Sequence, residues 1–259
     1  MLVDKLEKKD YSNSSLILKE MLLNIGNVDP YIRDKLIYNA FVELINKDYL
    51  SNQELKELFN QLTSHQYLLY KIGSDNDDSV YTRSFSALAL SVLINKDKEN
   101  RFLEESQIHF ILEKVCFYLI NEQDKRGFTI NKGWAHSIAH CADLLDELIT
   151  HPLFQPIFFE RVLEALLFCV TTPFVYEDDE LERLSIPFGA LINRYGLPEE
   201  HLHTLNHLID KCFSKNTYSY LDTRAISNIR NYLRAVYFKV NLEEDKLKLL
   251  NCLNQITTY

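Results

Sequence analysis

At 259 residues, with 46% hydrophobic residues, the chain is long and apolar enough to bury a substantial core. Its net charge of −9 opposes binding to nucleic acid or to anionic lipid, because their phosphates attract clustered Lys and Arg. Stretches without a charge are short; one of them, residues 165–176, contains Pro173 and is far shorter than the ~20 apolar residues of a membrane-spanning helix.

Helices are predicted along the whole chain. Only six glycines and six prolines interrupt it, and most stand where a helix would begin or end. Ser51 and Glu54 have the spacing of a capping box at one such start. No segment shows the alternation of a strand, so no sheet is expected. In chain order, the predicted helical hairpins pair 14–25 with 30–47, 52–72 with 79–96, 106–122 with 132–150, 155–171 with 177–194, and 199–213 with 220–240, and a terminal helix follows at 243–258.

A short sequence echo favours an array of repeated hairpins. Residues 44–48 read Leu-Ile-Asn-Lys-Asp, residues 93–97 repeat them, and residues 191–194 read Leu-Ile-Asn-Arg. Each copy ends the second helix of a hairpin, and the hairpins recur at the spacing of paired-helix repeats. The alternative is that these residues are merely a common helix ending. We predict an all-α fold in one domain, 1–259: an α/α superhelix, that is, a HEAT-like solenoid of about five helical hairpins plus a terminal helix.

The cysteines are widely spaced and stand mostly in apolar helical patterns; they are Cys116, Cys141, Cys169, Cys212 and Cys252. Because no two form a Cys-x-x-Cys pair, neither a thiolate zinc site nor a dithiol redox motif is expected. Free thiols in the core are typical of a reducing compartment. The first ten residues alternate in charge and lack the apolar core of a signal peptide. We therefore expect a cytoplasmic protein.

The first turns of the second helices carry one cationic residue each. These are Arg33, Arg83, Arg183 and Arg224, with His136 at the comparable place in the central repeat. Because second helices commonly line the concave side of a curved stack, the five side chains can face one groove. Alternatively, each arginine is solvated or pairs with a neighbouring acid, such as Asp34, Glu182 or Asp222.

The predicted helix 132–150 carries a concentration of polar chemistry. At 100° per residue, one polar stripe contains Lys132, His136, His140 and Asp143. Trp134 falls on the opposite side, among apolar residues that would anchor the helix in the core. The stripe is therefore expected to face solvent or a groove.

Two histidines one helical turn apart can share a divalent metal ion. Asp143 lies too far along the axis from His136 to be a good third ligand, and it is better placed to orient His140. The sequence nominates no ligand from another helix, so a metal at His136 and His140 is not favoured. The alternatives are a metal-free pocket in which the histidines bind or protonate a ligand, aided by Arg83 or Arg183, or ordinary groove residues.

A charged turn, residues 122–129, precedes the histidine helix. Asp124 and Arg126 are predicted to form a rim above the polar stripe, and Gly127 can supply a positive φ angle. The alternative is an exposed loop between two helices, without a role in binding.

The pattern Asp124-x-Arg126-Gly127, followed by Lys132-Gly-Trp134-Ala-His136-x3-His140-x-Ala-Asp143, resembles the central signature of a bacterial family classified as a domain of unknown function. Residues 81–85 also look familial, while Cys141 stands where the family often has glycine. The resemblance implies an all-helical, solenoid-like protein and assigns no activity. A weaker resemblance to lanthionine-cyclase-like α/α toroids implies no activity either, because the chain lacks the Cys-His pair of their zinc site.

We predict a binding module with a concave polar groove centred on the histidine helix. Its ligand is expected to be an anionic small molecule or peptide, and nucleic acid is not expected to bind. The residues predicted to line the groove or its rim are Arg83, Asp124, Arg126, Lys132, Trp134, His136, His140, Asp143 and Arg183. The alternative is a hydrolase or lyase that uses the same histidines as metal ligands or as general acid and base.

Overall fold

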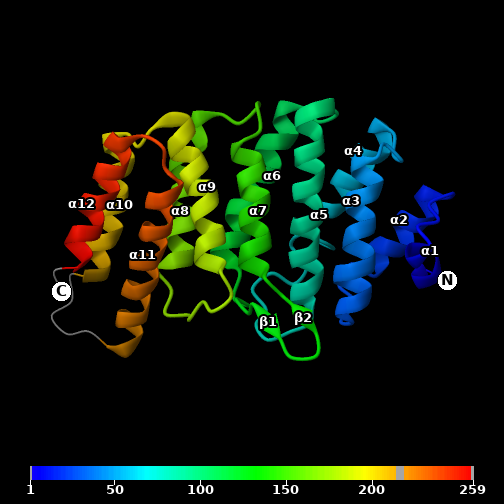
Figure 1. Ribbon diagram of the computed structural model, residues 1–259, viewed down its shortest axis with the longest axis horizontal. Coiled ribbons are helices and arrows are strands. Elements are labelled where there is room, and N and C mark those ends of the chain that lie inside the picture. Colours follow the sequence, from blue (N-terminus) through cyan, green and yellow to red (C-terminus); the bar gives the residue numbers. More distant parts are fainter. Residues whose placement is uncertain (1, 214–218, 258–259) are drawn as a thin grey trace.

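The computed structural model describes residues 2–213 and 219–257. Within these ranges the chain is all-α apart from one short hairpin (Figure 1). The α-helices are α1 (Leu2–Glu7), α2 (Ser14–Leu23), α3 (Tyr38–Asn46), α4 (Asn52–Leu62), α5 (Ser79–Asn100), α6 (Glu105–Asn121), α7 (Ser137–Ile149), α8 (Phe159–Val170), α9 (Glu180–Tyr195), α10 (Glu199–Phe213), α11 (Tyr220–Lys239) and α12 (Glu243–Thr257). A π-helical segment, η1 (Tyr31–Ile37), leads into α3, a 3₁₀ turn, η2 (Pro156–Phe158), leads into α8, and the strands are β1 (Phe128–Thr129) and β2 (Gly133–Trp134).

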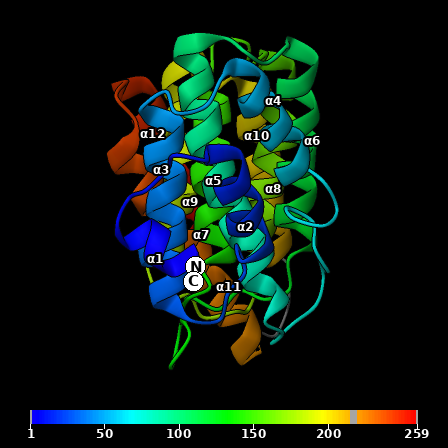
Figure 2. The same ribbon diagram turned by 90° about the vertical axis from the view of Figure 1, so that its right-hand side faces the viewer.

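The helices pack sequentially in two rows. Helices α3, α5, α7, α9 and α11, here called the odd row, each contact the next member of the row. Helices α4, α6, α8 and α10 form the even row, and each packs against the odd-row helix that follows it in the chain. Seen from the N-terminal end, the two rows lie side by side (Figure 2). A continuous apolar core fills the space between them.

The Leu-Ile-Asn echo has an equivalent structural role in two of its copies. The leucine and isoleucine of each copy are fully buried. Asn95, in the C-terminal third of α5, donates a hydrogen bond to Glu147 of α7. Asn193, at the end of α9, donates to the carbonyl of Lys239 on α11. Each of these asparagines therefore joins one odd-row helix to the next.

Several predicted boundaries are confirmed and others are wrong. The capping box is present, with the Ser51 N–H donating to Glu54 and the Glu54 N–H donating back to the Ser51 hydroxyl. The helix predicted at 52–72 ends at Leu62. The helix predicted at 132–150 begins only at Ser137. The end predicted at residue 258 lies outside the described residues.

The expectation of no sheet is wrong at β1 and β2, which form an antiparallel pair with Phe128 opposite Trp134. The turn between them uses positive φ angles at Asn131 and Gly133. Inside it, the Thr129 hydroxyl donates to the carbonyl of Gly133. Strands of two residues are too short to show alternation in sequence, so the pattern gave no signal.

The described cysteines, Cys116, Cys141, Cys169 and Cys252, are free and buried, as predicted; the side chain of Cys212 lies outside the described residues. Burial raises the pKa of the Cys116 thiol to about 12. These thiols therefore behave as small apolar groups. In the part of the chain that the structure describes, no helix is both long and apolar enough to cross a membrane.

Candidate functional site

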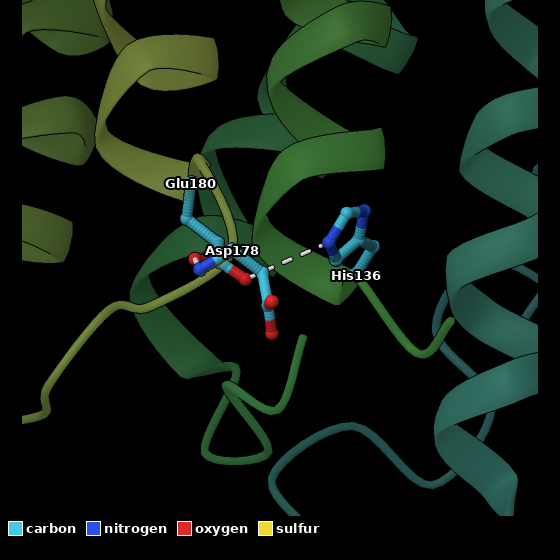
Figure 3. Close-up of side chains that lie close together, drawn as sticks. All are labelled: His136, Asp178 and Glu180. Carbon is cyan, nitrogen blue, oxygen red and sulfur yellow. Dashed lines mark hydrogen bonds and ion pairs between the residues drawn. The ribbon is translucent and has the colours of Figure 1, made fainter. Parts of the chain in front are cut away.

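The candidate site lies where α7 and α9 begin, side by side in the odd row (Figure 3). His136 immediately precedes α7 and has a φ of 44°, and Asp179 immediately precedes α9 and has a φ of 65°. Neither helix has a side-chain cap at these positions. Non-glycine residues in the left-handed region cost energy and tend to gather at functional sites. Two of the eight non-glycine residues with a positive φ in the described part of the chain lie at this junction.

The hairpin β1–β2 fixes the backbone of His136. Its N–H donates to the carbonyl of Arg126, and the preceding Ala135 N–H donates to the carbonyl of Gly127. The fully buried Arg33 holds the hairpin from the other side, because its guanidinium donates to the carbonyls of Lys132 and Trp134. His136 is thus positioned by contacts that are distant in the sequence.

The imidazole of His136 faces two carboxylates. It packs against the Trp134 ring, with centroids 4.3 Å apart. Its Nε2 has no hydrogen bond and lies 3.8 Å from Oε1 of Glu180, which also has none (Figure 3). Burial, and then the nearby Arg183, lower the pKa of His136, so the ring is neutral at pH 7.

Asp178 and Glu180 are held by backbone N–H groups. The Phe128 N–H donates to Oδ2 of Asp178 at 2.8 Å, and the Asp178 N–H donates to Oε2 of Glu180 at 3.0 Å. Burial, with the neighbouring aspartates, raises the pKa of Glu180. One donor atom each from His136, Asp178 and Glu180 lie within 4.8 Å of one another, which is close enough to share a metal ion. This group contains His136 of the predicted histidine pair but not His140.

Gly127 leaves room for the carboxylates. A Cβ at this position would lie 2.1 Å from Oδ2 of Asp178 and 2.6 Å from Oε1 of Glu180. Its φ is not positive, so the prediction of a left-handed glycine here is wrong. The physical reason for glycine is instead the close approach of two acidic side chains.

His140 is buried one turn further along α7. The Ser84 hydroxyl donates to the carbonyl of Ala135 and also contacts Nδ1 of His140 at 2.8 Å. Because the hydroxyl proton is engaged, Nδ1 must be the donor, which leaves Nε2 as the unprotonated nitrogen. Burial, and then His136, hold the pKa of His140 well below its usual value, so this ring is also neutral.

The prediction that Asp143 orients His140 is wrong. Instead both of its carboxylate oxygens accept from Arg183 of α9. Burial raises the pKa of Asp143 although Arg183 opposes this. The long side chain of Arg183 reaches from α9 to the Asp143 carboxylate on α7. The positive charge of Arg183 and the negative charge of Asp143 therefore offset each other.

The prediction that Arg83 lines a groove with Arg33 is wrong, because both guanidiniums are fully buried. Arg83 donates to the carboxylate of Glu122 at 2.5 and 2.8 Å. Arg224 is on α11, where its guanidinium lies over the Tyr220 ring. A buried charge is tolerated only when it is paired, so Arg33 and Arg83 became structural groups.

The predicted rim residues have other partners. Asp124 is fully buried and pairs with Arg126 through both oxygens. Lys132 pairs with Asp78 at 2.8 Å. Trp134 lies in β2 with 40% of its surface exposed and packs edge-on against Phe128, so its predicted place in the core is wrong. Lys132 and Trp134 precede α7 and are therefore not part of a helical stripe.

Ser84, Asp178 and Glu180 were missed by sequence reasoning. Nothing in the spacing of the acidic run 177–182 relates it to His136, which lies more than 40 residues earlier in the sequence. The one signal in the sequence was Gly127. A glycine beside charged residues can mark a turn, but it can also mark a place where another part of the chain approaches the backbone closely.

The arrangement offers acceptors and negative charge. Asp178 and Glu180 converge with the neutral His136, while the nearby Arg183 is already paired with Asp143. Such a set of groups can bind a cation or a hydrogen-bond donor, and it repels an anion.

Comparison with known proteins gives one match. A family model described as "Protein of unknown function (DUF2785)" matches residues 68–238, which include the hairpin, α7 and α9. No curated protein and no solved structure matches the chain.

Proposed function

Since this chain belongs to the DUF2785 family of proteins of unknown function, we propose its role from the geometry of the α7–α9 junction. It is a binding module built as a HEAT-like solenoid, and its ligand is a small molecule or peptide that presents a cation or hydrogen-bond donors. The solenoid is supported by the sequential contacts along the odd row and by the Asn95 and Asn193 bonds between repeats.

One observation carries the proposal: Nε2 of His136 and Oε1 of Glu180 are buried, face each other and lack hydrogen bonds. Leaving a buried polar atom without a partner costs about 1–3 kcal/mol. A ligand that supplies the missing partner recovers this energy. The acceptor character of Glu180 and the pairing of Arg183 favour a cationic ligand over the anionic ligand expected from the sequence.

Thermal unfolding in the presence of small probes tests this proposal. Spermidine and an arginine-containing tripeptide should raise the melting temperature of the protein, and citrate and inorganic phosphate should not. At a probe concentration of about 100 times Kd, the stabilisation is about 2.7 kcal/mol. The shift should be lost in Glu180→Gln and kept in Glu177→Gln, since Glu177 is an exposed member of the same acidic run.

Stabilisation by the anions alone would instead support the anionic ligand and refute our proposal. Stabilisation by the amines that persists in Glu180→Gln would place their binding elsewhere on the surface.

A second candidate function is hydrolysis or a lyase reaction. It is favoured by His140, whose neutral ring has its unprotonated nitrogen at Nε2 because Nδ1 donates to Ser84. Such a ring can act as a general base. The test is turnover of p-nitrophenyl acetate by the wild-type protein and by His140→Gln; equal rates would remove this candidate.

A further inference from the structure

We propose that His136, Asp178 and Glu180 together bind one divalent transition-metal ion. The inference rests on the proposed function, because it names the cation that the α7–α9 junction takes. It differs from the pair His136 and His140, because the two carboxylates come from the segment that begins α9 (Figure 3).

The separation of the donor atoms is compatible with coordination of one ion. Nε2 of His136 and Oε1 of Glu180 are 3.8 Å apart, and the whole group lies within 4.8 Å. Two ligands held at about 2.1 Å by a tetrahedral ion lie about 3.4 Å apart. Small side-chain rotations therefore bring the three groups to coordination distance without movement of α7 or α9.

The burial of Glu180 independently favours a cation at this place. It is only 1% exposed, and its Oε1 has no hydrogen bond. In the ranges 2–213 and 219–257, the one ion-pair partner found for Glu180 is His136, whose Nε2 lies 3.8 Å from Oε1, beyond hydrogen-bond distance. A buried carboxylate that lacks a charged partner is costly. A metal ion supplies that charge.

The surrounding groups orient the ligands as outer-shell partners do in metal sites. Backbone N–H groups fix one oxygen of Asp178 and one of Glu180, and the other oxygen of Glu180, Oε1, faces Nε2 of His136. Trp134 packs on His136 and restricts its ring. Gly127 has no side chain to obstruct the carboxylates.

The donor set selects the class of metal. One imidazole nitrogen with two carboxylate oxygens suits ions such as Zn²⁺ and Mn²⁺, whereas Ca²⁺ and Mg²⁺ prefer oxygen donors throughout. Three protein ligands leave at least one coordination position open.

The experiment is titration of chelator-treated protein with Zn²⁺ and with Mn²⁺, followed by calorimetry and by metal analysis after dialysis. We expect one ion per chain. The affinity should fall at least about 100-fold in Glu180→Gln and in His136→Asn, because loss of a ligand exceeds the 10–100-fold effect of losing an outer-shell partner. Asparagine is chosen at position 136 because it tolerates a positive φ.

Matched controls separate the metal site from general effects. Glu177→Gln removes an exposed charge from the same run, and His203→Gln removes an exposed histidine of α10; both should bind the ion with wild-type stoichiometry. If Glu180→Gln fails to fold, Asp178→Asn provides the same test at a partly exposed position. Co²⁺ absorption should change in His136→Asn, since a nitrogen ligand is lost.

Absence of stoichiometric binding to the wild-type protein, or equal affinity in Glu180→Gln and Glu177→Gln, would overturn the metal site. If spermidine still stabilises the protein through Glu180 in that case, the binding module stands without the metal. If neither the metals nor the amines bind, both proposals fail.

Discussion

At the scale of single residues, the family signature is explained by contacts that the sequence alone does not show. The sequence identified Gly127 and His136 as special, and both lie at the candidate site. It assigned Gly127 to a turn, whereas the residue makes room for Asp178 and Glu180. Those carboxylates were not predicted, because their approach depends on how α9 packs beside α7.

Gly127→Ala should displace the carboxylates of Asp178 and Glu180, since the new methyl group would lie 2.1 Å from one and 2.6 Å from the other. We expect a loss of about 1–3 kcal/mol in unfolding free energy, as for other overpacked positions, together with weaker Zn²⁺ binding. Chemical denaturation and metal titration measure the two effects. The double variant Gly127→Ala/Asp178→Gly lacks the Asp178 carboxylate that the new methyl group would meet, so it should lose less unfolding free energy than the two single variants lose in sum. Losses that add fully in the double variant would contradict this explanation.

Asp146 on α7 gives the protein a pH-dependent stability. Burial, and then the adjacent Glu147, raise the pKa of Asp146 from 3.8 to about 6. The folded protein therefore holds this proton more tightly than the unfolded chain, so stability falls as pH rises between about 4 and 6. Asp146→Asn should be more stable than the wild type by about 1–2 kcal/mol at pH 8 and little changed at pH 4.

Urea unfolding at the two pH values measures this difference. Asp75→Asn is the control, because Asp75 is exposed, and it should change stability little at either pH. A gain in Asp146→Asn that is equal at pH 4 and pH 8 would show that desolvation of the carboxylate is not the cause.

At the scale of elements, apolar periodicity and end signals predicted most helices, while long-range contacts decided the exceptions. The capping box at Ser51 is local and was predicted correctly. The predicted start of α7 is too early because Lys132 stands at helical spacing from His136 and so continues the polar stripe. Arg33 and the turn at Asn131 hold this segment in a hairpin instead. A contact with a residue about 100 positions away leaves no local pattern.

The Arg83–Glu122 ion pair should be a major link between α5 and the end of α6, because both side chains are fully buried. Arg83→Met leaves the Glu122 carboxylate buried without its partner, and we expect a loss of about 3–5 kcal/mol in unfolding free energy. Chemical denaturation measures it. The matched control is Lys132→Met, which breaks the exposed pair with Asp78 and should cost at most about 1 kcal/mol. Similar losses in the two variants would refute the importance of burial.

At the scale of the whole molecule, the order of the helices along the chain could be predicted from the sequence. The approach of the N-terminal ends of α7 and α9, which forms the candidate site, could not. The termini lie at opposite ends of the two rows (Figure 1). Helix α7 contacts both α5 and α9, whereas α2 and α12 lie near the ends. Stability in such a stack depends on contacts between neighbours.

Hydrogen exchange should therefore be slowest in α7 and faster in α2 and α12, because a helix at an end can open without breaking contacts on both sides. Exchange measured by mass spectrometry at neutral pH tests this gradient along the chain. Uniform protection from α2 to α12 would indicate that the molecule opens only as one unit.

The contacts of Arg33 also constrain the order in which the chain can fold. Its guanidinium meets carbonyl groups 99 and 101 residues later in the sequence. During synthesis, the first hairpins emerge well before those carbonyls exist, and contacts of such long range form slowly. We therefore expect a nascent chain that ends before residue 132 to hold an incompletely paired arginine at its surface. The segment that carries His136 can therefore be held by Arg33 only after the first half of the chain has been synthesised.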